Sequence, residues 1–155
     1  MKPAADEKKV LVRNRKARHE YQVDDTLEAG IVLLGSEVKS LREAQGNLVD
    51  AYCTIRDGEL WLLQAQISPY PWANQFNHEP RRERKLLARK PEIKRLAAKV
   101  REKGYTLIPT EIYLKKGRIK VEVALARGKR QFEKRESKKA AEAKREMEAA
   151  GSRRR

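Results

Sequence analysis

The sequence has 155 residues, 39% hydrophobic and 38% charged, with a formal net charge of +15. This length suits one domain with a short appendage. The charge favours a polyanionic partner, with nucleic acid ahead of an anionic membrane surface. No segment has the apolar length that spans a bilayer, and the first ten residues lack the apolar run of a secretory signal. We therefore expect a cytoplasmic protein that has no membrane partner.

Cysteine and histidine content argues against disulfide and metal chemistry. Cys53 is the single cysteine, so it has no partner for an internal disulfide. It lies in a strand-like run, where a buried structural thiol is expected rather than a nucleophile. Cys53, His19 and His78 are too few and too far apart in sequence to form a zinc site. We expect no cofactor.

The hydropathy pattern predicts mainly strands with a few helices. In chain order, these are strands at 19–23 and 27–34, a helix at 36–43, a hairpin of 51–56 and 59–67, a helix at 91–103, and a hairpin of 107–115 and 118–127. Asp57-Gly58 is a two-residue turn signal for the first hairpin. We place Asp24-Asp25 in a turn between the first two strands, and Ser36 as the cap of the first helix with Val38 and Leu41 directed inward.

The later elements have the clearest signals. Pro91 suits the first position of a helix, whose apolar face runs from Ile93 to Val100, and Gly104 suits its left-handed stop. In the last strand, apolar residues from Ile119 to Leu125 alternate with Lys120, Glu122 and alanines, which predicts a half-buried antiparallel strand.

Six short strands with two or three flanking helices indicate a small closed or nearly closed antiparallel barrel, because closure removes exposed strand edges. We assign a flexible N-terminus to residues 1–9, the barrel to 10–131 and a basic tail to 132–155. The tail has nine Lys or Arg, five Glu and only two large apolar residues. It cannot bury enough surface to fold alone, but its residues favour helix, so we expect disorder in isolation and a helix when bound.

Basic residues cluster at 13–18, 81–85, 127–130 and in the tail. One such run is typical of a solvated surface, but four runs on a compact barrel favour phosphate binding. Glu28 is unexpected in such a protein, and it suits a base edge or an arginine partner. Gly30, inside a strand, indicates either a bulge or a close approach by another segment. For His19, packing is favoured over stacking on a base.

Catalytic patterns are weak, and we expect no enzyme activity. Asp24-Asp25 with Glu28 is the one arrangement that suggests a metal-dependent nuclease. A turn explains the aspartate pair more simply. The sequence has no glycine-rich phosphate loop, nucleophile elbow or zinc spacing.

Several short motifs occur in an order that resembles the SsrA-binding protein (small protein B) family. The resemblance runs from about Asn14 to Glu136. The motifs are Asn14 to Tyr21, Glu28 to Ile31, Gly35 to Arg42, Asp57 to Leu60, Ile67 to Tyr70, Arg84 to Leu87, Lys103 to Pro109, Gly117 to Val121, Ala126 to Arg130, and Glu133 to Arg135. Each motif alone is weak, whereas the ordered set is highly specific.

The resemblance implies an oligonucleotide-binding (OB-fold-like) barrel that binds transfer-messenger RNA and delivers it to a stalled 70S ribosome. There the protein stands in for the RNA's missing anticodon arm, and its tail enters the messenger channel near the small-subunit decoding centre. Elongation factor Tu and alanyl-tRNA synthetase act through the same RNA, and we expect a monomer in a 1:1 complex. The alternative is a generic single-strand binder that stacks bases on aromatic side chains.

The resemblance and the basic clusters together give the candidate site residues. Asn14, Glu28 and Leu87 match family positions linked to RNA binding, and Lys120 and Lys129 match basic positions near the RNA and ribosome. The full RNA-binding set is Asn14, Arg15, Lys16, Arg18, His19, Glu28, Gly30, Lys39, Arg84, Lys85, Leu87, Lys120 and Lys129. The ribosomal set in the tail is Glu133, Lys134, Arg135, Lys138 and Lys139.

The chain also departs from the family pattern. Ala44 stands where many relatives have glycine, which puts the turn geometry there in question. Arg89 replaces the more common asparagine or histidine, and Glu133 replaces aspartate. The loop at 71–78 matches little, and we assign it no role.

Overall fold

The computed structural model describes residues 7–73, 77–102 and 104–128, apart from the Arg18 side chain. Its elements are β1 (Lys8–Arg13), α2 (Ala17–Glu20), β2 (Tyr21–Ile31), α3 (Gly35–Arg42), β3 (Gly46–Asn47), β4 (Tyr52–Arg56), β5 (Glu59–Leu63), β6 (Gln66–Ile67), β7 (Arg84–Leu87), α4 (Lys90–Val100), β8 (Tyr105–Lys115) and β9 (Arg118–Gly128).

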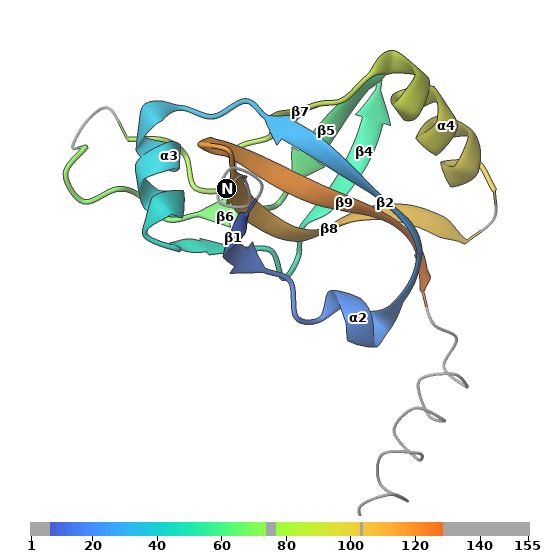
Figure 1. Ribbon diagram of the computed structural model, residues 1–155, viewed down its shortest axis with the longest axis horizontal. Coiled ribbons are helices and arrows are strands. Elements are labelled where there is room, and N and C mark those ends of the chain that lie inside the picture. Colours follow the sequence, from blue (N-terminus) through green and yellow to red (C-terminus); the bar gives the residue numbers. More distant parts are fainter. Residues whose placement is uncertain (1–6, 74–76, 103, 129–155) are drawn as a thin grey trace, which may run out of the picture.

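Six strands close a ring in the order β8, β4, β5, β7, β2, β9 and back to β8, and β1 joins the outer edge of β8. Every pair is antiparallel. The ring has the fewest paired residues between β4 and β8, where Cys53 pairs with Leu107, and between β2 and β7, where Gly30 pairs with Leu87. The expected mainly β barrel of about six strands with flanking helices is confirmed (Figure 1).

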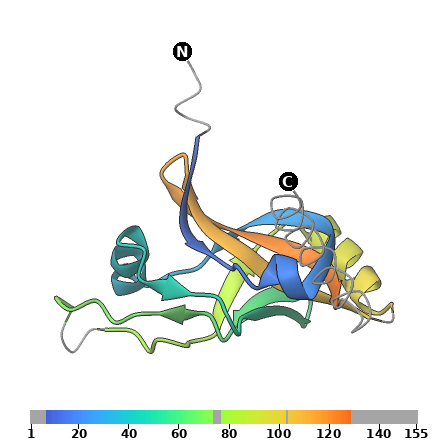
Figure 2. The ribbon, with the colours of Figure 1, turned by 90° about the horizontal axis from the view of Figure 1, so that it is seen from below.

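The β8–β9 hairpin is the longest unit of the barrel. It extends beyond the other strands with β1 alongside it (Figure 2). Lys8 pairs with Lys115 at the far end of this extension, so the first strand begins within the segment 1–9. In this extension β9, β8 and β1 pair as three antiparallel strands.

Alternating residues fill the barrel. Leu60, Leu62 and Val121 are fully buried, and α4 adds Ile93 and Leu96 to this core. Figure 1 shows α3 and α4 at opposite ends of the molecule. The apolar face of α4 ends earlier than predicted, because Val100 is exposed. Cys53 is buried as expected, and burial raises the pKa of its thiol.

One strand, β2, replaces the two strands that were predicted at 19–23 and 27–34. It pairs with β9 continuously from Tyr21 to Gly30, with one bulge between Val23 and Asp25. The expected turn at Asp24-Asp25 is therefore wrong, since both residues lie at this bulge. Asp25 Oδ1 accepts a hydrogen bond of 2.9 Å from the Thr26 backbone N–H, a local bond that suits a bulge as well as a turn.

The C-terminal half of β9 is buried on both faces, which corrects the half-buried prediction. Ala124 and Ala126, on the outer face, are fully buried against Ala17 of α2 and Ile108 of β8. The small alanine side chains let the short helix α2 lie directly on the sheet. On the outer face of β9, Lys120 and Glu122 remain partly exposed, whereas Ala124 and Ala126 are covered.

Helix α3 begins differently from the prediction. Its first turn is capped by Glu37, whose Oε1 accepts a 2.8 Å hydrogen bond from the Leu34 backbone N–H. Ser36 is not the cap. Its buried hydroxyl bonds His78 Nδ1 at 2.8 Å, and His78 Nε2 lies 2.8 Å from the Ile67 carbonyl oxygen. Because a carbonyl only accepts, Nε2 donates to it, and in a neutral imidazole Nδ1 then accepts from the Ser36 hydroxyl.

The end of α3 is a Schellman motif with alanine at its left-handed position. The backbone N–H groups of Ala44 and Gln45 donate to the Leu41 and Ser40 carbonyls at 2.9 and 3.0 Å. Ala44 has a φ of 58°, a conformation that favours glycine. The turn thus keeps its expected geometry despite the substitution.

We expect Ala44→Gly to stabilise the protein by about 0.5–1 kcal/mol, because it relieves the left-handed strain of a Cβ, less the entropy that glycine adds to the unfolded chain. Urea unfolding measures this change. Gly35→Ala is a suitable control, since an added Cβ there meets nothing within 4 Å and the backbone is not left-handed. Destabilisation by Ala44→Gly would contradict the strain argument.

Candidate nucleic-acid interface

The outer face of β2 brings together four predicted site residues. Leu27 and Ala29 point into the core, so Glu28 and Gly30 point outward. Gly30 pairs with Lys120 on β9 and with Leu87 on β7. These residues line a hollow of about 610 Å³, the Glu28 hollow, whose lining is Glu28, Gly30, Leu87, Ala88, Arg89, Glu92 and Lys120.

Gly30 fits the close-approach interpretation rather than the bulge. The register of β2 shifts at Val23 and Asp25, not at Gly30. A Cβ added to Gly30 would lie 3.4 Å from the Leu87 Cβ and 3.6 Å from its Cδ1. These are ordinary contact distances, so Leu87 lies directly against β2 at Gly30 but does not itself require a glycine there. Leu87 is still 51% exposed at the edge of the hollow.

Glu28 is held in place by two side chains from β8. The Tyr113 hydroxyl donates a 2.5 Å hydrogen bond to Glu28 Oε2, and Lys115 Nζ lies 3.3 Å from the same oxygen. The Tyr113 hydrogen bond is the main reason that the pKa of Glu28 is lowered, and Lys115 adds to it. Burial, and then Glu28, raise the pKa of Tyr113, so the phenol keeps its proton and donates.

The second oxygen of Glu28, Oε1, has no hydrogen-bond partner within the described part of the chain. Glu28 is thus an oriented, ionised acceptor with one oxygen available. An acceptor of this kind suits an amino group on a base edge or a ribose hydroxyl, and it repels phosphate.

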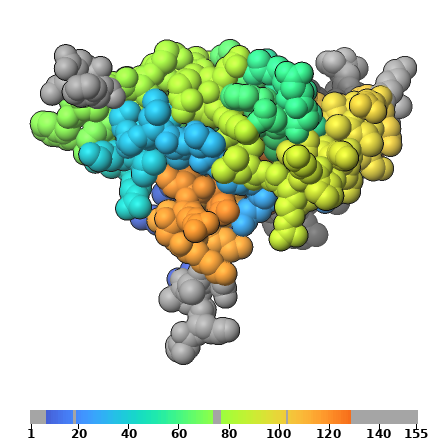
Figure 3. Space-filling model, turned by 90° about the horizontal axis from the view of Figure 1, so that it is seen from above, coloured from blue at the N-terminus to red at the C-terminus, as the bar shows by residue number. Residues whose placement is uncertain are grey.

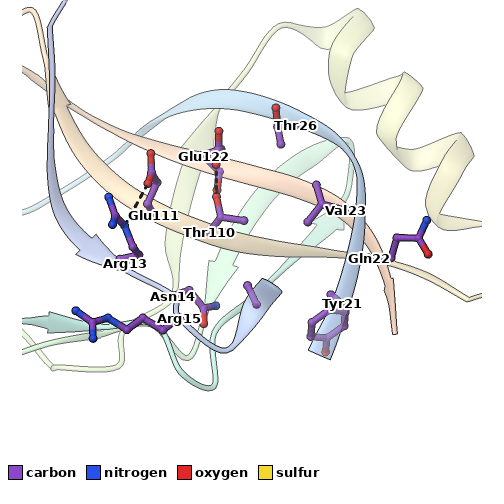
Figure 4. A pocket seen from close by; sticks show the side chains of 11 residues that line it. Arg13, Asn14, Arg15, Tyr21, Gln22, Val23, Thr26, Thr110, Glu111 and Glu122 are labelled. Carbon is purple, nitrogen blue, oxygen red and sulfur yellow. Dashed lines mark hydrogen bonds and ion pairs between the residues drawn. The ribbon is translucent and has the colours of Figure 1, made fainter. Parts of the chain in front are cut away.

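A second hollow, of about 810 Å³, lies on the same outer face beside α2 (Figure 4). Asn14 and Arg15, both predicted site residues, line it. Asn14 is only 8% exposed, and its Nδ2 donates to the Pro109 carbonyl at 2.9 Å, so it ties the end of β1 to β8. Its buried Oδ1 has no hydrogen-bond partner within the described residues. Arg15 lines the hollow and is exposed, and its neighbour Lys16 is also exposed.

The hollow beside α2 is lined by charges of both signs, from Arg13, Glu111 and Glu122. Lys8 forms an ion pair with Glu111 and lies over the Tyr113 ring at 4.7 Å, while the Thr110 hydroxyl donates to the Glu122 carboxylate. Figure 4 shows Arg13 directed toward Glu111. The face therefore offers both donors and acceptors, which suits a folded RNA surface better than bare phosphates.

Sequence reasoning missed Tyr113 and Glu122 as parts of this face. The polar alternation of residues 111, 113 and 115 in the predicted strand was the available signal. What the sequence did not indicate is that Tyr113 meets Glu28, because the two residues are 85 positions apart.

Arg84 does not belong to the interface, which corrects its prediction as an RNA contact. Its side chain is 0% exposed and its Nε donates to Glu37 Oε2 at 2.6 Å. The two other guanidinium nitrogens donate to the Ala65 and Pro80 carbonyls at 2.8 and 3.1 Å. Arg84 is a buried structural cation.

Other predicted contacts lie outside the two hollows. Lys85 forms an ion pair with Glu59, and Lys39 on α3 lies 5.6 Å from the Tyr70 ring centre. His19 is exposed on α2, so the favoured packing interpretation is wrong. The Arg18 side chain, Lys129 and the tail residues 133, 134, 135, 138 and 139 lie outside the described part of the chain.

The carboxylates that suggested a nuclease have structural partners. Asp24 Oδ2 accepts a 2.6 Å hydrogen bond from the Tyr105 hydroxyl, and Asp25 forms an ion pair with Arg95 of α4. Among residues 7–73, 77–102 and 104–128, no group of three or more His, Cys, Asp or Glu side chains is placed to hold a metal ion. No helix in those ranges is long and apolar enough to cross a membrane.

Comparisons with known proteins agree on one family. The model of the SmpB protein family matches residues 11–153. The SsrA-binding protein of Symbiobacterium thermophilum is 60% identical over 141 residues, covering 90% of this chain and 89% of the relative. That of Desulforudis audaxviator is 53% identical over 147 residues, covering 95% and 96%.

A solved structure is also similar. It is described as "tmRNA-SmpB: a journey to the center of the bacterial ribosome", and its matching chain is 45% identical with a TM-score of 0.66. The match covers 80% of this chain and 91% of that chain.

Proposed function

The chain belongs to the SmpB protein family, and we propose that it binds SsrA RNA, the transfer-messenger RNA, and acts with it in trans-translation on stalled ribosomes. The relatives are named for SsrA binding, and the similar structure is of tmRNA and SmpB at the ribosome. Within this chain, the gathering of Glu28, Gly30, Leu87 and Lys120 in one hollow is the observation that carries the proposal.

In this proposal the outer face of β2, β8 and β9 recognises the tRNA-like part of the RNA by shape. Oriented acceptors such as Glu28 contact base or ribose groups, while Lys120, Arg15 and Lys16 contact phosphates. The barrel stands in for the missing anticodon arm, and residues 132–155 reach the empty messenger channel and decoding centre. The protein supplies shape and charge, and breaks no bond.

The remaining partners follow from the RNA. Elongation factor Tu and alanyl-tRNA synthetase act on the same RNA molecule, without a dedicated site on this chain. One protein monomer binds one RNA, and the complex works in the cytoplasm, where ribosomes stall.

A generic single-strand binder is the less favoured function. Such proteins stack successive bases on exposed aromatic rings. Among the described residues, the strongly exposed aromatics are Tyr52 on β4 and Trp72 in the loop after β6. Neither residue lines the Glu28 hollow or the hollow beside α2.

Replacing Glu28 with alanine is expected to weaken binding to the tRNA-like domain by roughly 10- to 100-fold, the cost of one lost polar contact to a base. General electrostatics predicts the opposite, because the variant is more positive. Glu43→Ala, an exposed acid at the end of α3, removes the same charge outside the hollow and controls for this effect. Filter binding or calorimetry measures both. Tighter binding by Glu28→Ala would overturn the specific contact.

A further inference from the structure

Leu87 and Ala88 separate the Glu28 hollow from a groove on the other side of β7. This groove, of about 790 Å³, lies between α4 and the turn that joins β4 to β5, and we call it the α4 groove. Both hollows are lined by Leu87 and Ala88, so they lie on either side of this ridge. Figure 3 shows α4 and the β4–β5 hairpin packed next to each other at this end of the molecule.

The floor of the α4 groove is apolar. It is formed by Ile55, Leu86, Leu87, Ile93 and Ala97. Leu86 and Ile93 are buried, while Ile55 and Ala97 are half-buried and Leu87 is 51% exposed. A half-exposed leucine beside other apolar groups is surface that a flat apolar ligand can cover.

One rim of the groove carries unpaired positive charge. Lys90 and Lys94 line it from α4 and Arg101 from the residue after the helix, and none has an ion-pair partner within the described residues. The two other α4 cations are neutralised by neighbours, since Arg95 pairs with Asp25 and Lys99 with Glu102 at 3.6 Å. The cations of the groove rim are therefore the ones left available for an anion.

The opposite rim carries acceptors. Asp57 and Glu59 lie at the β4–β5 turn, where Glu59 pairs with Lys85. Asp57 has no hydrogen-bond or ion-pair partner in the described part of the chain. The carboxylates of this rim would repel an acidic peptide. A nucleotide base carries donor groups, so it can hydrogen-bond to the same carboxylates.

We propose that the α4 groove binds one unpaired nucleotide of the same RNA, with its base on the apolar floor and its flanking phosphates at Lys90, Lys94 and Arg101. This inference rests on the proposed function and extends its footprint across Leu87. The RNA strand leaves the Glu28 hollow, crosses the Leu87 ridge and places its next unpaired base in the groove. Asp57 accepts from the base edge.

The proposed phosphate contacts of the α4 groove are tested by the salt dependence of binding to a transcribed tRNA-like domain of transfer-messenger RNA. Each phosphate contact contributes about 0.7–0.9 to the slope of log K against log salt, so K90Q/K94Q/R101Q should reduce the slope by about 2. The matched control K9Q/R42Q/R81Q removes three exposed cations that line neither hollow. Its slope should change by less than about 1. Equal changes in both variants would overturn the proposal.

The proposed binding of a nucleotide base on the apolar floor is tested by a substitution that fills the groove and leaves its charge unchanged. Ala97→Phe places a ring on the floor and should weaken binding roughly tenfold, the loss of one stacked base. Ala98→Phe, at an exposed position that does not line the groove, should bind as the wild type does. In ribose acylation probing, one unpaired nucleotide should be protected by the wild type and reactive with Ala97→Phe.

The outcomes distinguish failure of the proposed function from failure of the α4 groove as a nucleotide site. If the wild type does not prefer the tRNA-like domain to poly-U, the proposed function fails. If the wild type binds and Glu28→Ala weakens binding, but Ala97→Phe and Ala98→Phe behave alike, only the groove inference fails. Binding of an acidic peptide, displaced by Ala97→Phe while the RNA is unaffected, would also overturn it.

Discussion

Replacing Glu37 with glutamine is expected to lower the free energy of unfolding by about 3–5 kcal/mol, because it leaves the buried charge of Arg84 without its counterion. Glu37 and Arg84 are both fully buried. Glu37 also accepts hydrogen bonds from the Arg82 side chain at 2.6 Å and from the Leu34 backbone at 2.8 Å. The carboxylate thus joins the first turn of α3 to β7. Urea unfolding measures the loss.

Glu83→Gln is the matched control. It breaks the Arg56–Glu83 pair, whose side chains are 48% and 56% exposed, and exposed pairs contribute less than about 1 kcal/mol. If Glu37→Gln destabilises the protein no more than Glu83→Gln does, the buried pair is not a major source of stability. The double variant Glu37→Leu with Arg84→Met should recover much of the loss, because it removes both charges.

The same pair predicts a pH dependence. Burial alone would raise the pKa of Glu37, but the hydrogen bonds from Arg82 and Leu34 and the charge of Arg84 outweigh it, so the pKa is lowered. A lowered folded-state pKa stabilises the fold above the ordinary value of 4.5. This stabilisation is lost as the pH falls through the folded-state pKa. Glu37→Gln should lack that part of the acid-induced loss.

Truncation after Gln131 is expected to leave affinity for the tRNA-like domain within about threefold of the full chain and to abolish tagging of stalled polypeptides. All residues of the two outer-face hollows precede residue 129. The removed segment carries a net +4, from nine bases and five acids, against +15 for the whole chain. Most of the attraction for RNA therefore remains, whereas the cationic segment that would reach the messenger channel is lost.

Two assays on the same samples check this prediction: binding to the tRNA-like domain, and tagging in a reconstituted translation reaction stalled without a codon. Glu28→Ala gives the contrasting pattern, since it should reduce both binding and tagging. A truncated protein that loses binding and tagging to the same degree would contradict a separate role for the tail.

The sequence predicted best the elements whose signals are local. Asp57 and Gly58 both have positive φ, 51° and 77°, as the two-residue hairpin turn requires. Lys116 and Gly117 repeat this geometry with φ of 52° and 76° between β8 and β9. Gly104 ends the segment after α4 with a φ of 90°. In each case neighbouring residues decide the backbone conformation.

Elements that depend on distant partners were missed. The strand β7 has four residues and begins at Arg84, so it reads as basic surface until Glu37, 47 positions earlier, is placed beside it. In β2, the local preference of Asp24-Asp25 for a turn is overridden by continuous pairing with β9, where Asp25 pairs with Leu125. Neither arrangement has a local sequence signal.

In the candidate site, too, the residues that could be predicted differ from those that depend on distant partners. Glu28, Leu87 and Lys120 were selected by family resemblance, and the basic clusters alone would not have selected the first two. The barrel explains why they belong together, because Gly30 is the position on β2 that faces both Leu87 and Lys120. Tyr113, which orients Glu28, has no signal other than strand alternation.

A competition experiment tests the central claim most directly. Labelled tRNA-like domain bound to the full-length protein is challenged with unlabelled tRNA-like domain or with poly-U across a range of salt concentrations. We predict that the folded RNA displaces the probe at far lower concentration than poly-U, with a preference that persists as salt weakens both. Equal displacement by the two competitors at every salt concentration would contradict recognition of a folded RNA by the outer face of the barrel.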